Sequence, residues 1–275
     1  MKVRLGWGGR CRDSYPQSIS HSIQIEELAK APYSTILCYP KPEEQQIEER
    51  LSELKKLGVE EVVLEGRVEI SGLRVLGKGC VSIVVVARCR EGGAALKIRR
   101  VDANRPSLSQ EAELQSLANR VGVGPKLYNF TNNFILMELI RGVNLPNWVK
   151  TLKGRDTASN LRRVCRDLLV KCWRLDRAHL DHGELSNLSK HVIVGDRVEI
   201  IDFESASTER SVRNVTSAAQ YLFIGGPVAS KIRRVLNLKN RGDIIEAIRS
   251  YKRERGSEEA LQLLLKRLKL VEQRS

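Results

Sequence analysis

The sequence predicts an α+β protein in which a strand-rich unit is followed by a helical unit. Its 275 residues, 41% of them hydrophobic, are enough for two units with a cleft between them. Short β-branched runs with one helical pattern fill residues 68–140, and apolar residues at helical spacing dominate from 141 to the end. We therefore divide the chain into an accessory region at 1–67, a strand-rich unit at 68–140 and a helical unit at 141–275.

The accessory region begins with a polar, Gly-containing stretch at 1–31, for which we expect a loose arm or an irregular cap. The apolar run 33–39 predicts a strand, and Glu43 and Glu44 open a helix that ends at Gly58. One apolar stripe runs along this helix: Ile47, Leu51, Leu54 and Leu57. A second strand at 59–64 would complete a small β-α-β unit.

The strand-rich unit has a simple predicted order of strands and one helix. Strands are expected at 68–75, 81–87 and 94–99, a helix at 109–120 and a last strand at 134–139. A connector rich in Gly, Pro and Asn follows at 142–154.

The helical unit starts with a long helix at 158–178, whose apolar face includes Cys165 and Cys172. A hairpin follows, with strands at 191–194 and 198–201, and helices resume beyond Asn214. The six cysteines form no Cys-x-x-Cys pair, so neither a zinc module nor a thioredoxin-type motif is indicated, and most are expected to be buried thiols.

The net charge of +14 is strong enough to attract polyanions. Residues 228–275 hold thirteen Lys and Arg against six Asp and Glu, a net +7. Contact with RNA through this basic region is one interpretation, and a solvated Lys/Arg/Glu-rich helical surface is the other. No segment has the length of a membrane span or the apolar run of a secretion signal, so we expect a cytoplasmic protein that does not enter membranes.

Two acidic residues follow apolar-flanked segments and carry the strongest chemical signal. Glu184 lies in His182-Gly183-Glu184-Leu185-Ser186, and Asp202 lies in Ile201-Asp202-Phe203, with the predicted hairpin between them. Such a hairpin can bring both carboxylates to one site. A base that orients a hydroxyl and a ligand for a phosphate-bound cation would suit phosphoryl transfer.

A glycine-rich turn and an isolated lysine add to this signal. Gly77 and Gly79 join two predicted strands, where glycine lets backbone amides approach phosphate oxygens. One strand later, Lys97 stands inside an apolar run, and a buried ammonium needs a compensating anion. Glu111 and Glu113 on the next helix are the candidate partners.

In this order the motifs resemble the protein kinase superfamily over residues 70–225. The details are most similar to its atypical RIO-type branch, in particular a predicted archaeal serine/threonine kinase group. The motifs are the glycine turn with Ser82 and Val84, Ala94-Ala95-Leu96-Lys97-Ile98, Glu111, Met137-Glu138-Leu139-Ile140, His182-Gly183-Glu184-Leu185 and Ile201-Asp202-Phe203. The resemblance implies a two-lobed kinase-like fold with a small N-terminal accessory unit and a reduced helical C-lobe.

The resemblance also implies a role for each matching residue toward ATP and Mg²⁺ or Mn²⁺. Gly77, Lys78 and Gly79 would cover the phosphates, Lys97 would hold them while paired with Glu111, and Asp202 would bind the metal. The adenine pocket would be formed by the side chains of Val84, Ala95 and Met137 and by the backbone of Glu138 and Ile140.

Two departures from the family pattern affect the chemistry. Glu184 stands where the family has a catalytic Asp, and Ser189 stands at the second metal position, where Asn is usual. Glu204 could supply a further oxygen if the strand continues past Asp202 and puts both side chains on one face. The histidines at 179, 182 and 191 lack a fourth ligand at zinc-like spacing, so we predict no zinc site and expect His182 to support the loop.

The resemblance implies an ATP- and Mg²⁺-dependent atypical serine/threonine protein kinase that acts on a protein substrate, and the protein itself is one candidate substrate. Ser205, Ser207, Thr208 and Ser211 are near enough to Asp202 for autophosphorylation. Two alternatives stay open: a nucleotide-binding ATPase or pseudokinase switch on an RNA-containing assembly, and a small-molecule phosphotransferase.

Overall fold

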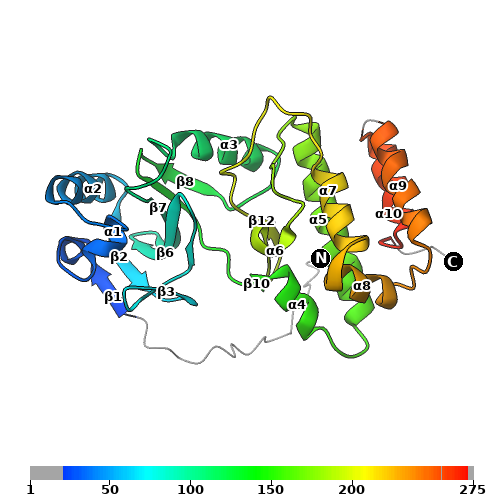
Figure 1. The fold of residues 1–275 in the computed structure, drawn as a ribbon, viewed down its shortest axis with the longest axis horizontal. Helices are drawn as coiled ribbons and strands as arrows, with labels where there is room; N and C mark the ends of the chain where they lie inside the picture. The colour runs from blue at the N-terminus through cyan, green and yellow to red at the C-terminus, as the bar shows by residue number, and fades with distance from the viewer. Residues whose placement is uncertain (1–20, 255, 272–275) are drawn as a thin grey trace, which may run out of the picture.

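Strands gather in one part of the molecule and most of the helices in the other (Figure 1). The computed structural model describes residues 21–254 and 256–271. One large hydrophobic cluster lies along the strand-rich part and another fills the helical part, with a small third cluster around Leu108 and Ile135. The α+β class predicted from the sequence is confirmed at this level.

The largest sheet is antiparallel, with the order β1-β2-β6-β7-β9-β8 and with β5 paired to β6. Its strands are β1 (His21–Gln24), β2 (Val59–Leu64), β5 (Gly77–Lys78), β6 (Ser82–Cys89), β7 (Gly92–Arg99), β8 (Leu127–Phe130) and β9 (Phe134–Glu138). The predicted strands at 81–87, 94–99 and 134–139 correspond to β6, β7 and β9. The register sets Val84 opposite Lys97 on β7, and Lys97 opposite Ile135 on β9.

Near this sheet, one predicted strand needs correction and one strand was not predicted. The continuous strand expected at 68–75 is a hairpin of β3 (Val68–Ile70) and β4 (Leu73–Val75). Ser71 and Gly72 both have positive φ, and this two-residue turn reverses the chain between β3 and β4. Strand β8 was not predicted, because its mostly exposed residues lack apolar alternation.

The N-terminal segments also differ from expectation. Residues 21–31 of the predicted loose arm contain β1 and a short 3₁₀ helix, η1 (Ile25–Ala29), and residues 1–20 of that arm lie outside the described residues. The strand expected at 33–39 is wrong, since α1 (Ser34–Leu37) is a single helical turn. Ile36, Leu37 and Cys38 are buried in succession, and such a run does not distinguish a strand from a helix.

Helix α2 (Glu44–Lys56) matches the predicted helix, with Lys55 and Lys56 in its last turn. Its buried Arg50 donates hydrogen bonds to the backbone carbonyls of Leu37, at 2.6 Å, and Arg99, at 2.7 Å. Strand β2 then pairs with β6 of the large sheet. The predicted β-α-β unit is therefore wrong, because its first strand is absent and its second belongs to the main sheet.

The helical part starts beyond β9. Its helices are α4 (Leu145–Thr151), α5 (Thr157–Arg177), α6 (Leu188–His191), α7 (Asn214–Phe223), α8 (Gly226–Val235), α9 (Arg241–Arg253) and α10 (Glu258–Arg267). A small antiparallel sheet joins β10 (Val143–Asn144), β11 (Val192–Val194) and β12 (Val198–Ile200). The segment predicted as a connector thus forms β10 and α4, and Asn144 caps α4 by accepting a hydrogen bond from the amide of Asn147.

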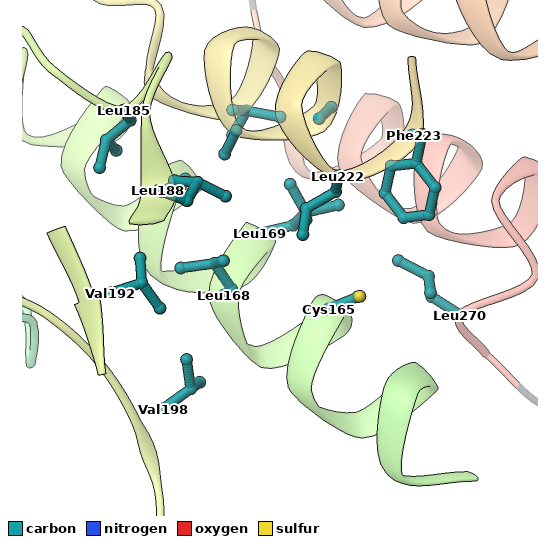
Figure 2. Packing of buried hydrophobic residues seen from close by; sticks show 14 of the residues in the cluster. Cys165, Leu168, Leu169, Leu185, Leu188, Val192, Val198, Leu222, Phe223 and Leu270 are labelled. Atoms are coloured by element: carbon teal, nitrogen blue, oxygen red, sulfur yellow. The ribbon is translucent and has the colours of Figure 1, made fainter. Parts of the chain in front are cut away.

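Helix α5 forms the centre of the helical core, as Figure 2 shows. Cys165, Leu168 and Leu169 on α5 lie among side chains of α7 and of the β11–β12 hairpin. Cys165 and Cys172 are fully buried free thiols, which confirms the predicted core role. Because the hairpin packs on α5, the loop before it and the residues after it have fixed positions.

Among the described residues, none of the helices combines the length and the apolar character that a transmembrane span requires. The sequence also lacks a run of about twenty apolar residues.

Candidate active site

Lys97 lies where the strand-rich and helical parts meet. Its ammonium is buried on β7, and Nζ donates to Glu111 Oε1 at 2.6 Å and to Asp202 Oδ1 at 2.8 Å. Glu111 comes from α3 (Ser109–Arg120), whereas Asp202 follows β12. Glu113, the alternative partner, is exposed. One buried cation thus binds two carboxylates from different parts of the chain.

The electrostatics of this cluster follow from burial and charge. Burial opposes the charged form of Lys97, but the carboxylates of Glu111 and Asp202 outweigh it and raise its pKa. Burial likewise opposes ionisation of Asp202, yet the neighbouring Lys97 holds the pKa of this carboxyl below its usual value. For the nearly inaccessible Glu111, burial prevails and raises the pKa. The pKa shifts of Lys97 and Asp202 thus both favour the charged forms, and Lys97 offsets the cost of burying Glu111.

The backbone at Asp202 is unusual and is held by His182. Asp202 has φ +71°, in the left-handed region that Asp tolerates better than most residues. A ring nitrogen of the buried His182, Nε2, lies 3.1 Å from the carbonyl oxygen of Ile201. The His182 ring also packs against Phe203, with 5.2 Å between ring centroids. His182 thus supports the segment that carries Asp202, as its predicted role requires.

Gly183 lets the chain turn so that Glu184 reaches the site. Its φ is +87°, and a Cβ there would lie 2.6 Å from the carbonyl oxygen of Ser205. The preceding Asp181 pairs through its backbone with Ser207, at 2.9 and 2.8 Å. The segment before Glu184 and the segment after Asp202 therefore lie side by side.

His191 lies between the two predicted acids. Its Nε2 is 3.6 Å from Glu184 Oε2, and its Nδ1 is 3.8 Å from Asp202 Oδ2. One ligand atom from each of the three residues falls within a cluster 4.8 Å across. The hairpin thus brings Glu184 and Asp202 together as predicted. The histidine between them was not among the predicted site residues, because no local spacing indicates a contact that depends on folding.

Glu204 joins the site by a route other than the predicted one. The strand does not continue past Ile200, yet Glu204 Oε2 lies 4.0 Å from Lys97 Nζ. Oxygens of Glu111, Asp202 and Glu204 form a second cluster that could hold a cation. Arg105 donates to the Glu204 backbone carbonyl at 2.8 Å and so holds this segment against the strand-rich part.

Ser189 has a different environment from Asp202. It lies in the short helix α6, where its hydroxyl donates to Asn187 Oδ1, and its backbone amide is 3.3 Å from the same oxygen. The hydroxyl thus stabilises the turn at Asn187. The two candidate cation clusters found among the described His, Cys, Asp and Glu residues each have three ligand atoms without Ser189. Its role as a metal ligand stays a prediction.

The glycine-rich turn is part of a strand pair. β5 pairs with β6, and the Gly79 amide donates to Ser82 O at 2.8 Å. A Cβ at Gly77 would meet nothing within 4 Å, so packing in the protein does not by itself require this glycine. Lys78 is exposed and lies over the Tyr39 ring, with Nζ 4.4 Å from the ring centroid.

Of the residues predicted to surround adenine, Val84, Ala95 and Met137 share one face of the sheet with Lys97. Ala95 and Lys97 point to the same face of β7, since they are two residues apart. Val84 lies opposite Lys97, and Met137 opposite Ala95. The Glu138 side chain accepts a hydrogen bond from Arg197 at 2.6 Å, and Ile140 follows β9 in the connection to β10.

A cavity of about 290 Å³ lies at one end of this face. Its lining includes Val86 on β6, Gly93 on β7 and both Leu139 and Arg141 beyond β9. None of the predicted nucleotide residues lines it. It therefore adjoins, rather than coincides with, the predicted adenine position.

The basic C-terminal helices use some of their cations in folding. Lys231 donates to Val149 O at 2.6 Å, and Arg233 donates to Phe223 O at 2.7 Å. Other basic residues are exposed on α9 and α10, among them Arg249, Lys252 and Lys266. This surface is compatible with either interpretation of the charge.

A buried ionic network near α5 was also missing from the predicted site. Glu199 on β12 is 2% exposed and accepts from Lys171 at 2.6 Å, from Arg197 at 3.0 Å and from the Gly124 amide at 2.9 Å. It joins α5, the hairpin and the loop that follows α3. The sequence signal that could have indicated this network is Glu199, a single charged residue between the apolar Val198 and Ile200.

Comparison with known proteins gives a relative without a described activity. No family model matches the chain. The uncharacterized protein MJ1211 of Methanocaldococcus jannaschii is 31% identical over 102 residues, which are 37% of this chain and 84% of that protein. Its name gives no substrate and no reaction.

Proposed function

The chain belongs to the family of that uncharacterized archaeal protein, and we propose that it is a RIO-like atypical kinase that uses ATP and a divalent cation to phosphorylate Ser or Thr of a protein. In this proposal the strand-rich part is the N-lobe and the helical part is the C-lobe of a kinase-like fold. The observation that carries it is Lys97, which lies between Glu111 and Asp202. This arrangement orients one cation toward the phosphates of a nucleotide.

The residues present fit a nucleotide with its metal. Glu111 Oε2 and His191 Nδ1 are buried polar atoms that lack hydrogen-bond partners among the described residues. Asp202 uses Oδ1 for Lys97 and directs Oδ2 toward His191, which leaves an oxygen for a cation. A divalent cation, when bound, would neutralise phosphate charge and align the phosphates.

The chain's own residues then have separate tasks. Lys97 donates to phosphate oxygens, and Glu111 fixes its direction. The turn from Gly77 to Ser82 would cover the phosphates through backbone amides other than that of Gly79, which donates to Ser82 O. Glu184, whose side chain is 44% exposed, faces solvent where a substrate hydroxyl can approach and accepts its proton. The oxygen of that hydroxyl then bonds to the γ-phosphorus while the bond to ADP breaks.

The proposal is tested by incubation with radiolabelled ATP and Mg²⁺ or Mn²⁺, alone and with model protein substrates. Asp202→Asn and Lys97→Met should each abolish transfer of label to protein, whereas Lys239→Ala at an exposed site should not. Equal labelling of the wild type and both site variants would refute the kinase assignment. Release of free phosphate only, stimulated by RNA, would favour the ATPase alternative, and label on a small molecule would favour the phosphotransferase.

A further inference from the structure

His191 is a buried imidazole whose Nδ1 is not accounted for by the fold. It ends helix α6 and is 5% exposed. Nδ1 has no hydrogen-bond partner among the described residues. The backbone of His191 is fixed, because its carbonyl accepts from the Ile201 amide at 2.9 Å, one residue before Asp202. A buried imidazole nitrogen without a partner is costly unless a ligand binds it.

Both ring nitrogens face carboxylates at distances longer than a hydrogen bond. Nδ1 lies 3.8 Å from Asp202 Oδ2, and Nε2 lies 3.6 Å from Glu184 Oε2. Two ligands that each lie about 2.1 Å from a small cation are roughly 3 to 3.5 Å apart. The gap between Nδ1 and Oδ2 therefore needs only a shift of a few tenths of an ångström to bind a cation.

We propose that His191 is a metal ligand, so that Asp202 Oδ2 and His191 Nδ1 together hold a divalent transition cation such as Mn²⁺ in preference to Mg²⁺. Lys97 already occupies Asp202 Oδ1, which assigns Oδ2 to the cation. Imidazole suits transition metals, whereas Mg²⁺ prefers an all-oxygen set. His191, and not Ser189, then supplies the second protein ligand.

The second ring nitrogen of His191, Nε2, connects the metal site to Glu184. Metal-binding histidines commonly donate their second ring N–H to a carboxylate, which fixes the tautomer and the orientation of the ring. Nε2–H of His191 would do this toward Glu184 Oε2. The same contact would hold the Glu184 carboxylate in place. Glu is one methylene longer than the Asp usual at this position, so its carboxylate needs such a contact to be positioned.

This inference deepens the proposed function, but the cation can be tested without any phosphoryl transfer. Mn²⁺ is titrated into the full chain without nucleotide and again with ADP, and free Mn²⁺ is followed by electron paramagnetic resonance. The affinity for Mg²⁺ is obtained from its competition with bound Mn²⁺ in the same measurement. The variants are His191→Ala, His191→Asn and Asp202→Asn, with His179→Asn as the matched control because His179 is exposed and Asn tolerates its φ of +54°.

The wild type should bind Mn²⁺ more tightly than Mg²⁺. His191→Ala should weaken Mn²⁺ binding by about 10-fold or more, as should Asp202→Asn. His191→Asn should shift the preference toward Mg²⁺, because an amide oxygen replaces the nitrogen. The control should change neither affinity. In the wild type, small amounts of Mn²⁺ should broaden the imidazole NMR signals of His191 before those of His179, a measurement that needs no folded variant.

Absence of Mn²⁺ binding to the wild type with and without ADP would overturn the inference, as would unselective broadening. Mn²⁺ affinity and preference that survive both His191 substitutions, while Asp202→Asn abolishes binding, would also overturn it and leave the proposed function intact. A fluorescent ATP analogue, bound without metal and displaced by ATP, tests nucleotide binding separately. If the analogue does not bind but the metal results hold, the site binds metal and the proposed kinase is wrong.

Discussion

The ammonium of Lys97 lies 2.8 Å from Asp202 Oδ1, although 105 positions separate the two residues in the sequence. Glu111 completes the cluster from a third segment, at 2.6 Å. Three buried or partly buried charges are tolerable here only because each offsets another. The cluster is therefore both a fold-level contact between the two parts of the molecule and the centre of the candidate site.

Replacing Lys97 by Met should destabilise the protein by about 3–5 kcal/mol, because it leaves Glu111 buried without its cation. The double variant Lys97→Met with Glu111→Gln should recover part of this loss, since no unpaired charge then stays buried. Urea unfolding of the wild type and these two variants measures both effects. The matched control is Arg253→Met, which breaks the exposed pair with Glu246 and should cost less than about 1 kcal/mol. If Lys97→Met and Arg253→Met lowered the free energy of unfolding by the same amount, burial would not set the cost.

Nucleotide should protect Cys80 from thiol reagents. Cys80 is exposed in the turn between Gly79 and Val81, which would close over the phosphates. Cys165 should not react until the protein unfolds, because burial raises the pKa of its thiol to about 12. Mass spectrometry of alkylated peptides, with and without ATP and Mn²⁺, separates the sites. A rate at Cys80 that ATP leaves unchanged would count against a phosphate site at this turn.

Gly183→Ala should destabilise the protein more than Gly72→Ala does. Both glycines have positive φ, +87° and +79°, so both substitutions strain the backbone by about 1 kcal/mol. Only at Gly183 would the new Cβ also meet backbone, since it would lie 2.6 Å from Ser205 O, whereas nothing lies within 4 Å at Gly72. Thermal unfolding of the pair isolates the steric contribution. Equal shifts in melting temperature would show that Gly183 is there for its backbone angle alone.

The sequence was enough to predict the features that local pattern controls. The amphipathic stripe of α2, the helix at α5 and the strands at β6 and β7 all follow from periodicity and end signals. The turn of α1 did not, because Ile36, Leu37 and Cys38 are buried without periodicity.

The candidate site shows the same division. Lys97 stood out as a charge inside an apolar run, and Glu111 lay at a suitable place on the next helix. His191 did not stand out, because only the pairing of β11 with β12 brings it between Glu184 and Asp202. Glu204 reaches Lys97 without the strand that the prediction required, since loop backbone after Asp202 turns its side chain to the same cluster.

Glu184→Gln should remove phosphoryl transfer while leaving nucleotide binding nearly unchanged. The amide keeps the size of the side chain but cannot accept the proton of a hydroxyl, and a positioned base contributes about 10²- to 10⁴-fold to such a step. Glu184 contacts neither Lys97 nor Glu111, so the affinity for a fluorescent ATP analogue should stay within about 3-fold, a change of less than 1 kcal/mol. Glu184→Asp should retain measurable activity, because it preserves the carboxylate at a shorter reach. Single-turnover labelling with radiolabelled ATP measures the rate, and the analogue measures binding in the same preparations. If Glu184→Gln transfers phosphate as fast as the wild type, the base lies elsewhere, and the half-exposed carboxylate has only a positioning role beside His191.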